Sequence, residues 1–190
     1  SRATTFNLDE YVGLSADHPC SYASYMRLRL FVQVDMDPAR AHLPNGAATD
    51  PIHEAQRYEA AISQAGGIDL QLLGIGENGH IGFNEPTSSL NSPTRIKTLT
   101  AKTLAANRQY FPIAEEMPRF AITMGVGTIL RSRKALLLAT GNAKAAAVAA
   151  MVEGPVSARC PASALQFHPD VTVMLDQDAA SALELVDYYS

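Results

Sequence analysis

Short apolar runs alternate with amphipathic stretches along the whole chain of 190 residues, and this alternation constrains the fold more than any other feature. Parallel strands need long crossovers that are usually helical, so the pattern favours an α/β fold with a mostly parallel, doubly wound (Rossmann-like) sheet flanked by helices. We expect one domain over residues 1–190. Strands are expected at residues 3–8, 68–75, 95–100, 119–124, 134–140 and 171–175, and helices at 21–34, 53–67, 104–111, 125–133, 142–155 and 178–189.

The composition argues against two classes of binding partner. The net charge is -4, and Lys and Arg are scattered rather than clustered, so neither a nucleic acid nor a membrane surface is expected as a partner. No apolar run approaches the ~20 residues that span a bilayer. Cys20 and Cys160 lie far apart, which favours two free thiols in a reducing cytoplasm, with a disulfide as the alternative. The five His are not clustered with Cys or acids at ligand spacing, so no metal site is expected.

A Gly-rich stretch, GIGENGHIGFNEP, follows the expected strand at residues 68–75. Gly74, Gly76 and Gly79 match the G-x-G-x-x-G fingerprint of dinucleotide-binding loops. The fingerprint requires a helix directly after the loop, and HIGFNEP does not begin a helix well. About twenty residues further on, where an acid should bind the ribose, the chain offers Arg95 and Lys97. The dinucleotide interpretation is therefore disfavoured.

The same loop is more coherent as a catalytic loop. His80 exchanges a proton near neutral pH without assistance, and Glu85 lies close enough in sequence to orient its ring and stabilise its charged form. Asn78 can position either group by a hydrogen bond. The alternative is a structural turn that contains a hydrogen-bonded histidine, and the motif alone does not decide between them.

Asp9 and Glu10 follow the first expected strand, at the edge of the sheet where α/β proteins place their chemistry. A carboxylate there can abstract a proton next to a carbonyl group, although an acid facing water is the simpler explanation. Lys144 is expected in the first turn of a helix, where a cation is disfavoured unless an anion is also bound. This placement indicates a phosphate, with a solvated surface lysine as the alternative.

Five segments together resemble the glucosamine-6-phosphate deaminase (glucosamine-6-phosphate isomerase) family, in order over nearly the whole chain. They are TTFNLDEYVGL, LGIGENGHIGFNEP, SSLNSPTRIKTLT, FAITMGVGTIL and LQFHP. The resemblance implies conversion of glucosamine 6-phosphate and water into fructose 6-phosphate and ammonia, in the catabolism of amino sugars. It implies no cofactor, a small sugar phosphate as the only partner required, and a homo-oligomer in some members.

The resemblance also implies a role for each matching residue. Asp9 would be the base that moves a proton between C2 and C1 of the sugar, and His80 would promote opening of the sugar ring. Glu85 would lie behind His80, and Asn78 occupies a position where other members carry Asp or Asn. Lys144 matches the lysine that binds the substrate phosphate.

Three further positions match an allosteric site for N-acetylglucosamine 6-phosphate in some members: Ser89, Arg95 and Lys97. Where the family usually has a substrate-binding Arg, this chain has Gln109, so Arg108 is kept as a secondary substrate candidate. Members carry roughly sixty further N-terminal residues with a phosphate-binding Gly-rich loop, and without them the sheet would expose an edge. We therefore expect that the N-terminal strand–helix portion is missing from this sequence.

Two other functions compete with the deaminase. A 6-phosphogluconolactonase-like hydrolase would carry a similar G-x-G-x-[DN]-G-H block, but such proteins normally lack the GFNEP and DEYVG segments that are present here. A sugar-phosphate-binding protein without catalysis would fit the absent phosphate loop. Retention of Asp9, His80 and Glu85 argues against this second alternative.

Overall fold

The computed structural model describes residues 2–189, and their contacts form two compact units. The first unit comprises residues 2–65 and 94–123, and the second comprises residues 66–93 and 124–189. The chain therefore leaves the first unit after residue 65, returns to it at residue 94 and leaves it again after residue 123. One domain over residues 1–190 stays a prediction. Within residues 2–189, no helix is long and apolar enough to cross a membrane.

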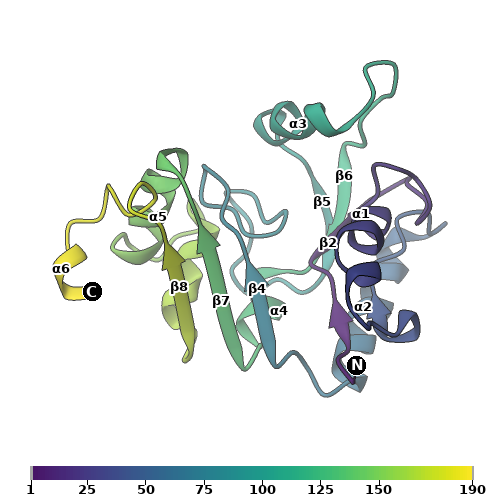
Figure 1. The fold of residues 1–190 in the computed structure, drawn as a ribbon, viewed down its shortest axis with the longest axis horizontal. Coiled ribbons are helices and arrows are strands. Elements are labelled where there is room, and N and C mark those ends of the chain that lie inside the picture. The colour runs from purple at the N-terminus through teal and green to yellow at the C-terminus, as the bar shows by residue number, and fades with distance from the viewer. Residues whose placement is uncertain (1, 190) are drawn as a thin grey trace. The chain divides into compact units, whose positions relative to one another are not determined.

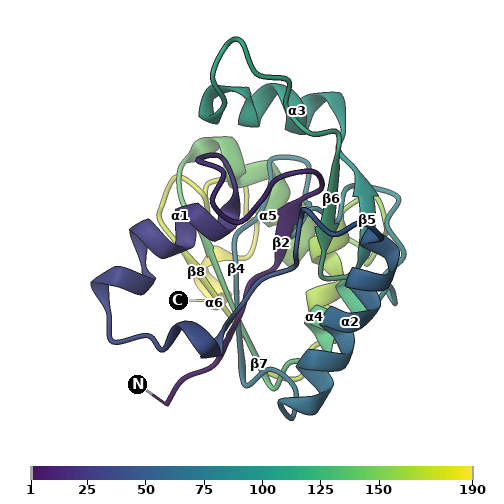
Figure 2. The same ribbon diagram turned by 90° about the vertical axis from the view of Figure 1, so that its right-hand side faces the viewer.

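The first unit contains two small sheets. Its elements are β1 (Thr5–Phe6), β2 (Asp9–Tyr11), α1 (Tyr22–Arg29), η1 (Phe31–Gln33), η2 (Pro38–Arg40), β3 (Ala41–His42), α2 (Pro51–Gln64), β5 (Arg95–Thr98), α3 (Ala101–Asn107), η3 (Arg108–Tyr110) and β6 (Phe120–Thr123). β1 pairs with β3 in parallel, and an antiparallel sheet has the order β2-β6-β5. β5 and β6 run side by side below α3 in both ribbon views (Figure 1, Figure 2).

Helices in the first unit begin where the sequence supplies a capping side chain. Ser21 accepts a hydrogen bond from the backbone N–H of Ser24 at the start of α1, and Thr100 does the same for Thr103 at the start of α3. Asp50 accepts from two backbone N–H groups of α2, whose first residue is Pro51. These local signals explain why the predicted helices exist, although α1 ends at Arg29, earlier than expected.

The second unit is built on a parallel sheet of order β4-β7-β8, seen as adjacent arrows in Figure 1. Its elements are β4 (Leu70–Leu73), α4 (Val126–Leu130), β7 (Lys134–Ala139), η4 (Asn142–Lys144), α5 (Ala145–Val152), η5 (Pro161–Phe167), β8 (Val171–Leu175) and α6 (Val186–Tyr189). The α/β class with a parallel sheet is therefore confirmed. The antiparallel sheet of the first unit was not predicted by the alternation of strands and helices.

The two faces of the β4-β7-β8 sheet differ in burial. Leu73 and Leu137 are paired on one face and are almost completely buried. On the opposite face, Leu72, Leu138 and Met174 keep between 44% and 56% of their surface exposed. Parallel sheets are normally covered on both faces. The described residues of the second unit thus bury one face and leave apolar side chains exposed on the other.

The last expected helix, residues 178–189, is mostly absent: only Val186–Tyr189 is helical. The acidic side chain of Glu153 explains the difference. Its carboxylate accepts hydrogen bonds from the backbone N–H groups of Glu184 and Leu185. These two donors would bond to backbone carbonyls in a continuous helix, so the segment before Val186 forms turns instead.

Strand positions near the N-terminus also differ from the prediction. The expected strand at residues 3–8 is reduced to Thr5–Phe6, and Asp9 begins a separate strand, β2, rather than ending the first one. The switch is possible because β1 pairs with β3 whereas β2 pairs with β6. Asp9 is therefore placed by an antiparallel neighbour, which the local sequence did not reveal.

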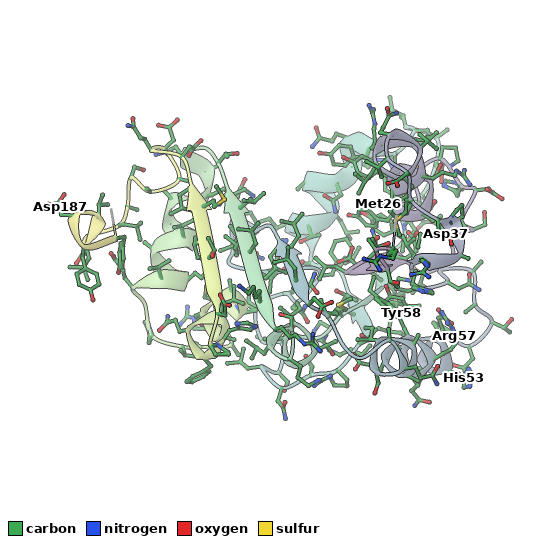
Figure 3. The ribbon with its side chains drawn as sticks, turned by 60° about the horizontal axis from the view of Figure 1, so that its bottom comes forward. Met26, Asp37, His53, Arg57, Tyr58 and Asp187 are labelled. Carbon is green, nitrogen blue, oxygen red and sulfur yellow. The ribbon has the colours of Figure 1, made fainter. Side chains whose placement is uncertain are left out.

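Tyr58 connects α2 to β1 and β3. Figure 3 labels it on α2 together with His53 and Arg57. Its side chain is fully buried, and its hydroxyl oxygen lies 2.8 Å from the carbonyl oxygen of Asn7 and 3.1 Å from that of His42. A buried hydroxyl that donates to a backbone carbonyl stabilises the fold, because the carbonyl oxygen of Asn7 loses this donor when the hydroxyl is removed, whereas that of His42 keeps the backbone N–H of Asn7.

We expect Tyr58→Phe to lower the free energy of unfolding by about 1–3 kcal/mol, measured by chemical denaturation. Tyr25→Phe is the matched control, because Tyr25 is 56% exposed on α1 and its change should be within about 0.5 kcal/mol. Equal stability of the two variants would show that the Tyr58 hydroxyl contributes nothing.

Candidate active site

The Gly-rich loop after β4 is shaped by close approaches at two glycines. A Cβ atom on Gly76 would overlap the imidazole ring of His80, so the ring lies directly against the backbone there. Gly79 has φ of +80° and faces Cys160, whose Sγ would lie 2.5 Å from an added Cβ. Any other residue at either position would displace the neighbouring side chain. Gly76 therefore makes room for the ring of His80, and Gly79 makes room for Cys160.

A chain of hydrogen bonds runs through the loop from Glu85 to His80. The side-chain amide of Asn78 donates from Nδ2 to Glu85 Oε2 at 2.8 Å, and its Oδ1 lies 2.7 Å from His80 Nδ1. His80 Nδ1 is also 3.5 Å from Glu85 Oε2. Glu85 is only 3% exposed, whereas the His80 side chain keeps 23% of its surface. The predicted contact of His80, Asn78 and Glu85 is thus present in the structure.

The order of donors and acceptors fixes the state of the imidazole ring. An ionised Glu85 accepts hydrogen bonds and cannot donate them, so it must face the NH₂ group of Asn78. The carbonyl oxygen of Asn78 then faces His80 Nδ1, which must carry a proton. In the neutral ring the lone pair is consequently on Nε2. The chain presents His80 Nε2 as a proton acceptor and keeps Nδ1 protonated.

Two residues that the sequence did not single out hold the loop in place. Asn84 is fully buried and donates from Nδ2 to the carbonyl oxygens of Ile81 and Met124, both at 2.8 Å. Thr87 has φ of +77°, and its N–H donates to Ala158 at 2.7 Å. Asn84 is one of the letters of GFNEP, but its role depends on Met124, forty residues away in the sequence, so no local signal predicts it.

Lys144 lies where a strand leads into a helix of the second unit. It ends η4 and is the N-cap residue of α5, so the backbone N–H groups at the start of α5 lie next to it. Gly141, with φ of +83°, turns the chain before it and donates from its N–H to both carboxylate oxygens of Asp176 at 3.0 Å. The structure therefore places Lys144 at a helix N-terminus, as predicted, and its binding of phosphate stays a prediction.

Asp9 belongs to the first unit and is held by the β2-β6 pairing. It lies opposite Thr123, whose hydroxyl donates to Asp9 Oδ2 at 3.4 Å. The side chain is partly buried. His80, Asn78, Glu85 and Lys144 belong to the second unit. The catalytic role of Asp9 stays a prediction.

Glu10 has a structural role that the sequence did not reveal. It is only 1% exposed, and its carboxylate accepts hydrogen bonds from the N–H groups of Tyr11 at 2.9 Å, Tyr22 at 3.0 Å and Ala23 at 2.9 Å. Tyr22 and Ala23 are the first residues of α1, so Glu10 caps this helix from a neighbouring strand. Glu10, the residue after Asp9, thereby fixes the start of α1 beside β2.

The remaining predicted positions lie apart from the loop of His80. Arg108 donates to the carbonyl oxygens of Glu115, Pro112 and Ile113 at 2.7–2.9 Å, so its guanidinium closes a local turn. Gln109 is exposed and donates to Ala106. The substrate role of Arg108 stays a prediction, although its donors are already engaged by the backbone.

The predicted allosteric residues are distributed over both units. Ser89 is exposed in the second unit, whereas Arg95 and Lys97 lie on β5 of the first. The register places Arg95 opposite Thr123, on the same face of the antiparallel sheet as Asp9. Burial lowers the pKa of Arg95, which still remains a cation. A regulatory role for these residues stays a prediction.

Comparison with known proteins gives a consistent result. Residues 1–174 match the family described as glucosamine-6-phosphate isomerases/6-phosphogluconolactonase. A glucosamine-6-phosphate deaminase of Hahella chejuensis is 61% identical over 185 residues, covering 97% of this chain and 70% of the relative. One of Rhodopirellula baltica is 56% identical over 184 residues, covering 97% of this chain and 73% of the relative. The chain thus spans less than the full length of these relatives.

Solved structures agree with the sequence comparison. The structure of a monomeric glucosamine-6-phosphate deaminase has a TM-score of 0.91 at 51% identity and covers 94% of this chain and 74% of that chain. A 6-phosphogluconolactonase of Trypanosoma brucei has a TM-score of 0.66 at 20% identity, covering 94% of this chain and 73% of that chain. The second likeness shows a shared fold only.

Two buried glutamates of the first unit should give opposite pH dependences. Burial raises the pKa of Glu10 above its ordinary value of 4.5, despite the three backbone donors. For Glu54, burial acts in the same direction, but hydrogen bonds from Arg57 and Asn45 outweigh it and lower the pKa. The folded state thus binds the proton of Glu10 more tightly than the unfolded state, and that of Glu54 less tightly.

We expect the free energy of unfolding of the native chain, minus that of Glu10→Gln, to fall as the pH rises from about 4.5 through the raised pKa of Glu10. For Glu54→Gln the corresponding difference should be largest above pH 4.5 and should be lost as the pH falls through the lowered pKa. Urea denaturation between pH 3.5 and about 8 measures both. A difference that rises with pH for Glu10 would mean that its backbone donors outweigh its burial.

Proposed function

Because this chain belongs to the glucosamine-6-phosphate isomerase/6-phosphogluconolactonase family, we propose that it is a glucosamine-6-phosphate deaminase. Such an enzyme converts glucosamine 6-phosphate and water into fructose 6-phosphate and ammonia, an isomerisation coupled to loss of the amino group. Identities of 51–61% to deaminases, against 20% to the lactonase of Trypanosoma brucei, support this choice within the family. The observation that carries the mechanism is the hydrogen-bond chain from Glu85 through Asn78 to His80.

His80 is suited to opening the sugar ring. Ring opening breaks the bond between C1 and the ring oxygen, and it requires removal of the proton from the C1 hydroxyl and protonation of the ring oxygen. A neutral imidazole with its lone pair on Nε2 accepts the first proton and can return it to the ring oxygen. Asn78 holds the ring in this tautomer, and buried Glu85 orients Asn78. The open chain then carries a free aldehyde at C1.

Asp9 is suited to the isomerisation step. A carboxylate that removes the proton from C2 generates an enolamine, because C2 carries the amino nitrogen. Return of the same proton to C1, with one proton passing from the amino group to the C1 oxygen, gives an imine at C2, which water hydrolyses to the ketone of fructose 6-phosphate and ammonia. The protons and electrons balance without a redox cofactor. The hydrogen bond from Thr123 orients the Asp9 carboxylate.

Lys144 is suited to anchoring the phosphate. A phosphate at the start of α5 would receive backbone N–H groups and the Lys144 ammonium together. Binding energy gathered at the phosphate fixes the distant reacting end of the sugar and lowers the entropic part of the barrier. A cytoplasmic location and an oligomeric state remain predictions.

A release assay for ammonia tests the function directly. The 190-residue chain and a form extended to the full length of its relatives would be supplied with glucosamine 6-phosphate. We expect ammonia and fructose 6-phosphate in equal amounts from the extended form. With 6-phosphogluconolactone as the alternative substrate, faster hydrolysis than deamination would favour the lactonase. No turnover of either substrate, with sugar phosphate still bound, would favour the non-catalytic binding protein.

Asp9→Asn should lower kcat for ammonia release by about 10²–10⁴-fold, because an amide cannot accept the C2 proton. Binding of fructose 6-phosphate, measured by calorimetry, should change by less than about threefold. Thr123→Val is the companion variant: it removes the donor to Asp9 but keeps the carboxylate, so it should reduce kcat less. Loss of binding with unchanged kcat would make Asp9 a contact to the ligand rather than the base.

Asn78→Leu should lower kcat for ammonia release, because it removes the side chain that accepts from His80 Nδ1 and donates to Glu85. An ammonia-release assay measures this loss. Asn91→Leu serves as the control, since Asn91 is exposed outside the loop. An unchanged kcat for Asn78→Leu would show that the hydrogen-bond chain contributes nothing to turnover.

A further inference from the structure

Three side chains with different metal-binding groups meet in the first unit, and the proposed deamination uses none of them. They are the imidazole of His18, the thiol of Cys20 and the carboxylate of Glu115. One ligand atom from each lies within 4.8 Å of the other two. His18 and Cys20 come from the loop before α1, whereas Glu115 comes from the segment between η3 and β6. The spacing of residues along the sequence does not reveal this cluster, because Glu115 lies far along the chain from His18 and Cys20.

The distances describe a cluster that is assembled and accessible. His18 Nε2 lies 2.8 Å from Glu115 Oε1, and their side chains are 27% and 32% exposed. Cys20 is a free thiol that donates weakly to the carbonyl oxygen of Tyr110 at 3.4 Å. An ion from solvent can therefore reach all three groups, and the segments that carry them are already in contact.

We propose that His18, Cys20 and Glu115 form a binding site for one Zn²⁺ ion, with water as the fourth ligand. Tetrahedral zinc takes sulfur at about 2.3 Å and nitrogen or oxygen at about 2.0–2.2 Å, which separates its ligand atoms by roughly 3.3–3.7 Å. The observed cluster needs only a local adjustment to meet this geometry. Imidazole and thiolate ligands favour zinc over Mg²⁺ and Ca²⁺, which prefer oxygen ligands throughout.

Zinc binding changes the protonation of two ligands. Burial, together with the nearby Glu115 carboxylate, raises the pKa of the Cys20 thiol, so without metal the thiol keeps its proton. The ion displaces this proton into solvent and binds the thiolate. The backbone N–H of Cys20 donates to His18 Nδ1 at 3.1 Å, which leaves the ring proton on Nε2, toward Glu115. Coordination through Nε2 moves this proton to Nδ1, so the Cys20 N–H must separate from the ring.

The tautomer change of His18 opposes the binding of Zn²⁺. The affinity for Zn²⁺ should therefore be lower than that of a site whose histidine already has the required tautomer. The rearrangement also means that the bound ion joins the loop before α1 to the segment after η3 more firmly than the His18–Glu115 hydrogen bond does alone. Ligand binding to the folded state should therefore raise the melting temperature of the chain.

The test is a titration of the chelator-treated chain with Co²⁺, a spectroscopic substitute for Zn²⁺, followed by displacement with Zn²⁺. We expect one Co²⁺ per chain with a thiolate-to-cobalt charge-transfer band in the near ultraviolet, abolished by Zn²⁺. Cys20→Ser should remove the band. His18→Ala and Glu115→Gln should each weaken binding by at least about tenfold while far-ultraviolet circular dichroism stays unchanged.

Cys160→Ser is the matched control, because it removes the other thiol and leaves the cluster intact. It should retain the band, the stoichiometry and the rise in melting temperature with Zn²⁺. Absence of a band from the native chain would overturn the proposal. A band that survives in Cys20→Ser or disappears in Cys160→Ser would overturn it as well, because the metal would then be bound by Cys160. None of these readouts depends on deaminase activity.

Discussion

A buried carboxylate must be given hydrogen-bond donors, and this requirement organises the candidate residues in both units. An unpartnered charge in the interior costs far more than a single packing contact contributes, so each buried acid determines where its donors lie. Glu10 takes backbone N–H groups from the start of α1 and thereby fixes that helix beside the strand of Asp9. Glu85 takes the amide of Asn78 and thereby fixes the tautomer of His80. In each case a buried glutamate that need not touch the substrate holds the segment of a residue that the proposed reaction uses, His80 or Asp9.

Two glycines of the loop make room for neighbouring side chains. His80 can lie against the backbone only because Gly76 has no side chain, and Gly79 makes room for Cys160 in the same way. The motif resembles a dinucleotide fingerprint because both structures need close approach to a backbone, one by a pyrophosphate and the other by an imidazole ring. After the glycines, the loop of this chain is tied to Met124 by the side-chain amide of Asn84, and no helix follows it directly.

The proposed zinc site is independent of this chemistry in residues and in evidence. It joins two segments of the first unit that hold no residue of the His80 loop. Its existence would add a response to metal ions to an enzyme whose proposed reaction needs none. It also shows why a search for metal ligands along a sequence fails when a third ligand is contributed by a distant segment: spacing detects only ligands that share a turn or a helix.

The sequence alone determined the α/β class, the loop of Asn78, His80 and Glu85, and the place of Lys144 before a helix. These features follow from local patterns: strand and helix periodicity, capping side chains and the letters of one contiguous motif. Tertiary structure alone decided that Asp9 begins an antiparallel strand, that Glu10 caps a helix twelve residues away, and that Glu115 meets His18 and Cys20. It also replaced most of the expected final helix by turns, because Glu153 accepts from the backbone N–H groups of Glu184 and Leu185. Local propensity cannot anticipate such outcomes, because each depends on a partner that the chain brings close only after folding.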